Sequence, residues 1–134
     1  MKLIFCIDDK KGMMFFGKRQ SQDRVLRGWI VNHTAESKLW MSNYSAKQFE
    51  DLTGYITDDE YASKAAIGDY CFVEDKGYSL ENVSEIILCH WNRKYQADKF
   101  LDIDMKAEGF KKIESVDIKG SSHDKITIET YRKA

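Results

Sequence analysis

The sequence contains no proline, only three cysteines, and no apolar run close to the about 20 residues that a membrane-spanning helix needs. No linker, repeat or low-complexity segment divides it, so we expect residues 1–134 to form a single domain. Cys6, Cys71 and Cys89 lie inside apolar segments, which is typical of reduced core thiols and not of a disulfide framework. These absences favour a cytoplasmic protein with no membrane partner.

An excess of one charge sign is also missing. The chain has 21 Lys and Arg against 22 Asp and Glu, which gives a net charge of −1. A general nucleic-acid-binding protein draws its affinity from a basic excess, so that class is not expected. A small anionic ligand remains open, because it needs only a local group of cations.

The spacings that usually signal catalysis are absent. His33, His90 and His123 form no metal-binding pattern, and the chain has no phosphate-binding glycine loop and no nucleophile elbow. We therefore expect no metal, no cofactor and no catalytic residue, and hence a protein that is not an enzyme. His90 lies in an apolar segment and is predicted to be a hydrogen-bonded core residue, whereas His33 and His123 are predicted to lie at the surface.

The hydrophobic pattern predicts strands separated by two or three helices. A loop is expected over 8–20, a helix over 22–34 capped by Ser21, a short helix capped by Ser45, and a helical piece around 59–66. The expected strands are 2–7, 38–44, 69–75, 84–91, 110–120 and 125–133, the last two as an antiparallel pair. The fold class is therefore α+β, close to a three-layer α/β arrangement, with a mixed, largely antiparallel sheet of about six strands.

Residues 8–23, DDKKGMMFFGKRQSQD, place bulky apolar side chains beside a cationic loop. One interpretation is structural, with Met13 and Met14 packing as a hydrophobic staple next to solvated charges. Phe15 and Phe16 are adjacent, however, so both cannot point into one core, and one is free to stack on a planar ligand or to fill a partner's groove. Nearby groups that could hold an anion are the helix N-terminus after Ser21 and the side chains of Lys18, Arg19 and Arg24.

A second stretch, 91–99, repeats this mixture of aromatic and cationic residues after the most apolar strand. It is either a polar hairpin or a ligand-binding loop. We predict that a nucleotide-like ligand lies between the 13–24 and 91–99 loops, which could come from different subunits. The candidate ligand-binding residues are Phe15, Phe16, Lys18, Arg19, Gln20, Ser21, Arg24, Tyr44, Trp91, Asn92, Arg93, Lys94 and Tyr95.

The order of elements resembles a reduced dihydrofolate reductase. MKLIFCIDDKKGM is similar to that family's first strand and loop, KLWMSNYSAKQFED to its strand–turn–helix, SEIILCHWNRKYQADKF to its late strand and loop, and ITIETYRK to its closing strand. Asp23 falls where the family's folate-binding carboxylate would lie. The family's Trp-Pro pair and its Gly-Gly turn are absent, and residues 42–45 replace its Gly-Arg-Thr cofactor turn. The resemblance therefore implies the fold and not the reductase activity.

A closer resemblance is to small phage and clostridial proteins with a DD-x-x-GMxF-x-x-RRQS-x-D opening and a K-L-W-M-x-x-Y-S strand. The matching positions are Asp8, Asp9, Asp23 and the runs 12–15, 18–21 and 38–45, and Lys18 departs from the double arginine. On these motifs the chain resembles the Thoeris anti-defence sponge proteins. The resemblance implies a symmetric homo-oligomer, a homodimer or larger, that holds cyclic ADP-ribose isomers without cleaving them. Some members also hold cyclic oligonucleotides.

Other functions remain open at this stage. The aromatic and cationic loops fit a sponge for a nucleotide-derived signal, but they also fit an immunity or inhibitor module in which Phe15 and Phe16 enter a partner protein. A minimal reductase-like enzyme is a third possibility, and the missing motifs count against it.

Overall fold

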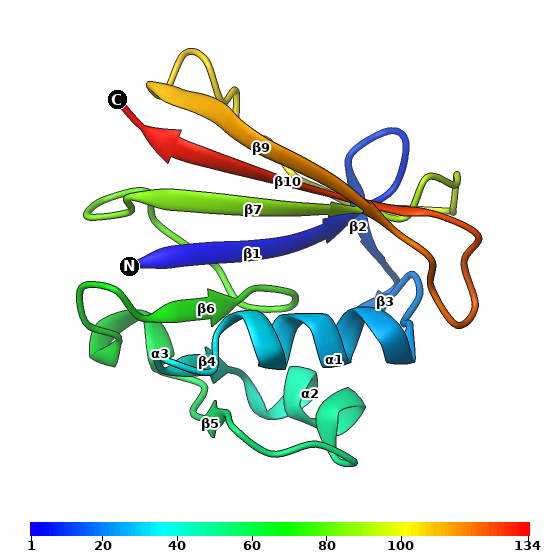
Figure 1. The fold of residues 1–134 in the computed structure, drawn as a ribbon, viewed down its shortest axis with the longest axis horizontal. Helices are drawn as coiled ribbons and strands as arrows, with labels where there is room; N and C mark the ends of the chain where they lie inside the picture. The colour runs from blue at the N-terminus through cyan, green and yellow to red at the C-terminus, as the bar shows by residue number, and fades with distance from the viewer.

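The computed structural model describes residues 1–134, which form one large sheet, one small sheet and short helices (Figure 1). The large sheet has seven strands in the order β5-β4-β6-β1-β7-β10-β9. Their bounds are Ile56–Thr57 (β5), Leu39–Met41 (β4), Tyr70–Phe72 (β6), Lys2–Ile7 (β1), Glu85–His90 (β7), Ile126–Lys133 (β10) and Phe110–Ile118 (β9). Both termini lie at the same end of this sheet.

The mixed α+β fold class is confirmed, but the main sheet is more parallel than expected. Strands β5, β4, β6, β1 and β7 pair in parallel, and only β10 pairs antiparallel, with β7 on one side and β9 on the other. The apolar runs in β1 and β7 explain the difference, because they are buried on both faces of the sheet, as parallel strands usually are. The short β5, which the sequence pattern did not reveal, completes one edge.

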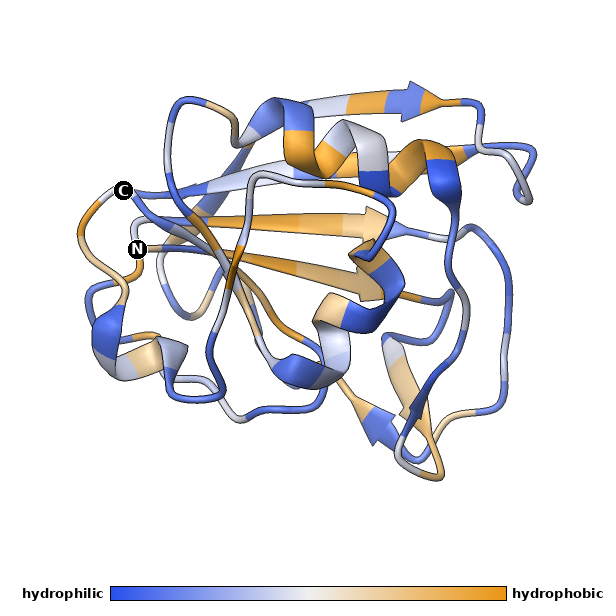
Figure 2. Ribbon diagram, turned by 90° about the horizontal axis from the view of Figure 1, so that it is seen from below, coloured by the Kyte–Doolittle hydropathy of each residue, from blue (hydrophilic) through white to orange (hydrophobic).

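Two apolar cores cover the two faces of the large sheet, and Figure 2 shows the hydrophobic central strands between them. On one face, helix α1 (Arg24–His33) packs Leu26 and Ile30 with Phe49 of the 3-10 helix η1 (Lys47–Phe49). On the other face, Met13 and Met14 pack with residues of β1 and β7. Cys71 and Cys89 are buried, Cys6 is half-buried, and all three are free thiols.

The 8–20 segment is not the expected loop. It forms a hairpin of β2 (Gly12–Phe15) and β3 (Lys18–Arg19), and β2 also pairs with β8 (Lys99–Phe100) in a separate three-stranded sheet. Phe16 and Gly17 form the turn with φ of 49° and 71°. Positive φ at both positions is typical of a type I′ turn, where Asn-Gly is the usual signal, so a Phe-Gly turn is hard to recognise from sequence.

Both helix caps differ from the prediction. Asp23, and not Ser21, caps α1, because its Oδ1 accepts hydrogen bonds from the backbone N–H of Val25 and Leu26. Helix α2 (Asn43–Ala46) is capped by Ser42, and Ser45 lies buried inside it. Ser and Asp are similarly good caps, so long-range contacts decide between neighbouring candidates.

Helix α3 (Tyr61–Lys64) falls within the expected 59–66 piece. None of the helices combines the length and the apolar character that a membrane span requires.

Candidate functional site

The two stretches singled out in the sequence lie side by side in the structure. The β2–β3 hairpin contacts the 91–99 loop through two hydrogen bonds, one from Phe16 N–H to Asp98 Oδ2 (3.1 Å) and one from Asp98 N–H to the Met14 carbonyl (3.0 Å). Between them is an open hollow of about 510 Å³, which we call the aromatic–cation hollow. Its lining residues are Phe15, Lys18, Arg19, Gln20, Lys94, Tyr95 and Gln96.

An aromatic pair stands at the edge of this hollow. The rings of Phe15 and Phe16 lie 4.2 Å apart at 31°, and Phe16 is 79% exposed. Because the tight turn holds Phe16 out of the core, its ring offers an apolar face to solvent before any ligand arrives.

The cations at the hollow differ in whether a carboxylate already pairs with them. Lys18 and Lys94 are exposed and have no carboxylate partner, so both can contact an anion. Arg19 is already paired: its Nε and Nη2 donate to the two carboxylate oxygens of Glu74 at 3.0 Å each, and its guanidinium lies 4.4 Å from the Tyr44 ring centre. Burial lowers the pKa of Arg19, but Glu74 outweighs this effect and the pKa is raised. Arg19 is therefore part of the wall, and Tyr44, which does not line the hollow, packs against its guanidinium.

A buried carboxylate holds the back of the hollow together. Asp8 Oδ1 accepts from the N–H groups of Lys10 and Gly12, and Oδ2 accepts from Gln20 Nε2 (2.9 Å) and from Tyr95 N–H (3.2 Å). Burial favours the neutral acid, yet these donors together lower the pKa of Asp8 below its usual value. Asp8 thus joins the two loops. The other amide atom of the Gln20 side chain, Oε1, is buried without a hydrogen-bond partner.

His123 ties the same loops to the β9–β10 turn. It is buried, which corrects the surface prediction. Its Nε2 lies 3.1 Å from Ser21 Oγ and 3.0 Å from the Tyr95 hydroxyl, and its ring stacks on Trp91 at 4.5 Å. Trp91 is itself only 4% exposed, so the expectation that it contacts a ligand is wrong.

The N-terminus of α1 is not open to an anion either. Asp23 occupies it, and the Arg24 N–H donates to Ser121 Oγ. Ser21 is held by His123. Of the remaining predicted residues, Asn92 donates from its amide to the Lys125 carbonyl and to Thr127, while the exposed Arg24 and Arg93 lie outside the lining of the hollow.

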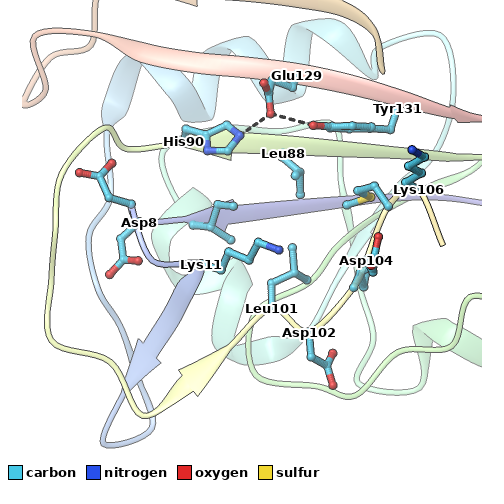
Figure 3. A pocket seen from close by; sticks show the side chains of 14 residues that line it. Asp8, Lys11, Leu88, His90, Leu101, Asp102, Asp104, Lys106, Glu129 and Tyr131 are labelled. Carbon is cyan, nitrogen blue, oxygen red and sulfur yellow. Dashed lines mark hydrogen bonds and ion pairs between the residues drawn. The ribbon is translucent and has the colours of Figure 1, made fainter. Parts of the chain in front are cut away.

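Sequence reasoning missed a second cleft. It has a volume of about 610 Å³ and lies at the carboxyl ends of β1 and β7, on the face opposite α1 (Figure 3). His90 contacts Glu129 there at 2.5 Å, so the predicted hydrogen-bonded histidine is confirmed, although it is half-buried and lines this cleft. The alternation in ITIETYRK, which places Glu129 and Tyr131 on one face of β10, was the available signal. The complete lining is Ile7, Asp8, Asp9, Lys11, Leu88, His90, Leu101, Asp102, Ile103, Asp104, Met105, Lys106, Glu129 and Tyr131.

The space between α1 and η1, by contrast, is filled. The cavity there measures only about 10 Å³. Asp23 points its carboxylate into the helix cap and the β9–β10 turn, so it is not available to a ligand at this position.

No family model and no curated protein matches the sequence. Among solved structures, the chain is similar to the dihydrofolate reductase from Enterococcus faecalis complexed with NADP(H) and RAB-propyl. The TM-score is 0.66 at 13% sequence identity, and the match covers 98% of this chain and 94% of that chain. The dihydrofolate reductase-like fold is therefore confirmed, and at this identity the likeness extends to the fold alone.

Proposed function

We propose that this protein binds a small anionic, nucleotide-derived signal and sequesters it without altering it. The observation that carries the proposal is the meeting of two distant aromatic and cationic loops in one hollow of about 510 Å³. The resemblance to the Thoeris anti-defence sponge proteins narrows the ligand to cyclic ADP-ribose isomers, with cyclic oligonucleotides as a further class. It also implies a phage protein that acts in the infected cell.

The lining supplies both kinds of contact that such a ligand needs. A base stacked on an aromatic ring gains roughly 1–3 kcal/mol, and a charge-assisted hydrogen bond to phosphate gains about 1.5–3 kcal/mol. Phe15 and Tyr95 line the hollow with aromatic rings, and Phe16 adds an exposed ring at its edge. Lys18 and Lys94 offer ammonium groups that no carboxylate pairs with. Two contacts of each kind are enough for about micromolar affinity after the entropic cost of association.

The chemistry around the hollow favours holding a ligand over transforming it. Ser21, His123 and Asp23 follow the hydrogen-bond order of a nucleophile, base and orienting carboxylate. However, the His123 side chain is 1% exposed and its Nε2 is shared with Tyr95, so a substrate has no path to it. The one carboxylate at the back, Asp8, already accepts four hydrogen bonds.

A direct test incubates the protein with each cyclic ADP-ribose isomer, removes free ligand, and releases bound material by heat for mass spectrometry. Recovery of intact ligand supports sequestration. Recovery of altered ligand would contradict sequestration and indicate an enzymatic function. The double variant Lys18→Gln/Lys94→Gln should lose at least about 90% of the captured ligand, because both phosphate contacts are removed. Lys38→Gln/Lys47→Gln, which changes two exposed lysines outside the hollow, should capture as much as the unmodified protein.

A second candidate, a protein-binding inhibitor module, is favoured by the 79% exposure of Phe16. In that case no isomer would be depleted. Phe16→Ala would then abolish partner capture. The double variant Lys18→Gln/Lys94→Gln would still capture the partner.

A further inference from the structure

The cleft at the carboxyl ends of β1 and β7 shares no lining residue with the aromatic–cation hollow. Ligands of open α/β sheets usually bind outside the carboxyl ends of the strands. The position of this cleft and its volume of about 610 Å³ are typical of a small-molecule site. Its ligand is therefore a separate question from the ligand of the hollow.

The lining of this cleft is predominantly acidic. Two ammonium groups, those of Lys11 and Lys106, face five carboxylates, which belong to Asp8, Asp9, Asp102, Asp104 and Glu129. A cleft lined mainly by one charge sign focuses the electric field inside it and attracts ions of the opposite sign. The excess of carboxylates therefore selects a cation and repels an anion.

Carboxylates of the cleft wall are held in place, whereas the two ammonium groups are not. Asp102 Oδ1 accepts a hydrogen bond from the Tyr78 hydroxyl (2.8 Å), and Asp104 Oδ1 accepts one from the Ala107 N–H (3.1 Å). Both lysines are exposed, and neither ammonium has a hydrogen-bond or ion-pair partner. A cationic ligand can therefore displace the lysine side chains into solvent while the carboxylates stay where they are.

The two buried carboxylates are ionised. Burial raises the pKa of Glu129, but the hydrogen bonds from Lys112 and His90 outweigh this effect, so the pKa is lowered. Burial also acts on Asp8, where the backbone and Gln20 donors again lower the pKa. Both groups therefore add negative charge to the cleft at neutral pH.

The floor of the cleft is apolar and firmly packed. It consists of four aliphatic side chains, each at most 5% exposed, namely Ile7, Leu88, Leu101 and Ile103. Figure 3 shows Glu129 of β10 on one side of this floor and Asp102 and Asp104 on the other. An alkyl chain can therefore lie on the floor between two acidic walls.

These carboxylates are spread around the floor and do not converge on one point. No three acidic, histidine or cysteine side chains of the molecule come together as a metal ion requires. A metal ion would also gain nothing from the apolar floor. Separated carboxylates with an apolar surface between them fit an organic molecule that carries a cationic group at each end of an alkyl chain.

We propose that this cleft binds an aliphatic diamine, with one ammonium group at each acidic wall and the methylene chain on Leu88 and Leu101. Charge-assisted hydrogen bonds to the carboxylates hold the two ends, and the chain leaves water for the apolar floor.

An NMR titration with cadaverine, pentylamine and the matching diol tests this proposal, because these chains of equal length end in two, one and no ammonium groups. Cadaverine should shift the methyl signals of Leu88, Leu101 and Ile103 saturably. Pentylamine should bind at least about tenfold more weakly, and the diol more weakly still.

Three variants locate the binding in the cleft. Asp102→Asn/Asp104→Asn should weaken cadaverine about tenfold, because one wall loses its charge while the amide oxygens still accept the same hydrogen bonds. Lys11→Gln should strengthen cadaverine binding, since it removes a competing ammonium. Asp51→Asn/Asp124→Asn removes the same charge from exposed positions outside the cleft and should change the affinity by less than about twofold.

Equal affinities for cadaverine and the diol would overturn the proposal. An equal loss in the two double variants would also overturn it, because overall charge would then explain the binding. Shifts confined to Phe15, Tyr95 and Gln96 would do the same, since they would place the probe in the aromatic–cation hollow. Capture of cyclic ADP-ribose isomers should be unaffected by Asp102→Asn/Asp104→Asn, so the two sites succeed or fail separately.

Discussion

His123 Nδ1 lies 2.9 Å from Asp23 Oδ2, and this buried pair joins the β9–β10 turn to the start of α1. The same carboxylate caps the helix and also accepts hydrogen bonds from the N–H groups of Ser121 and Ser122. On its other side His123 meets Ser21 and Tyr95, one from each loop of the aromatic–cation hollow. The pair therefore sets the position of both loops, although neither residue lines the hollow.

Removing this carboxylate should destabilise the protein strongly. Asp23→Ala takes away the helix cap and leaves His123 and two backbone N–H groups without their partner, so we expect a loss of about 3 kcal/mol in the free energy of unfolding. Urea unfolding measures it. Asp124→Ala, at an exposed neighbour in the same turn, should change stability by less than about 0.5 kcal/mol, and a similar loss in both variants would contradict this assignment.

The same carboxylate should make stability depend on acidity. Burial raises the pKa of Asp23, but hydrogen bonds from Ser121, Ser122 and His123 outweigh this effect and hold the pKa below its usual range. A depressed folded-state pKa contributes stability that is fully present above the unfolded pKa and is lost as the pH falls toward the folded value. The free energy of unfolding should therefore decrease as the pH falls below about 4. In Asp23→Asn, urea titrations across this range should show a shallower decrease.

Gly12 and Gly28 should respond to alanine in opposite directions. A Cβ at Gly12 would lie 2.6 Å from Gln20 Nε2 and 2.7 Å from Asp8 Oδ2, at the junction behind the hollow. Gly12→Ala should therefore cost about 1–3 kcal/mol and reduce ligand capture. Gly28 lies within α1 with nothing near its Cβ position, so Gly28→Ala should stabilise by about 0.5–1 kcal/mol. Thermal unfolding of both variants measures these changes in stability. If both substitutions change the stability in the same direction, this reasoning is wrong.

Arg19 should matter more for stability than for direct contact with a ligand. Arg19→Ala leaves the largely buried Glu74 without its ion-pair partner, and we expect a loss of about 3 kcal/mol. Arg19→Lys should recover only part of it, since a lysine cannot donate to both carboxylate oxygens in parallel. Denaturation curves for these variants are to be compared with Lys18→Ala, which should unfold like the unmodified protein. If Arg19→Ala lowers ligand affinity at unchanged stability, Arg19 is a contact residue after all.

We also expect the protein to be a homodimer or a larger symmetric oligomer in solution. Exposed aromatic residues such as Phe16 and Phe100, with 79% and 51% exposure, are typical of surfaces that a second copy covers through a two-fold interface. Multi-angle light scattering at micromolar concentration should give a mass of at least twice 15.6 kDa. A monomer mass across the whole elution peak would argue decisively against this expectation.

Local patterns were sufficient where a strand carries its own signal. The apolar runs of β1 and β7 and the period-two alternation of β10 predict these strands, because burial on two faces or on one face selects those patterns. The alternation of β9 also predicts a strand, although this edge strand is exposed along most of its length. The mixture of aromatic and cationic residues likewise indicated which two loops to examine. That they meet at one hollow follows from Asp8, which bonds to Gln20 and Tyr95 across 12 and 87 positions.

Only the tertiary structure decided which charged and aromatic residues are free. Arg19 is paired with Glu74, 55 positions away. His123 forms a buried hydrogen-bonded pair with Asp23, 100 positions away. Trp91 is covered by that same histidine ring. Such partners are brought together by the folded sheet, and no local spacing in a single sequence encodes them. The sequence by itself therefore determined the main strands and the chemical character of the loops, and long-range packing determined which of their side chains can meet a ligand.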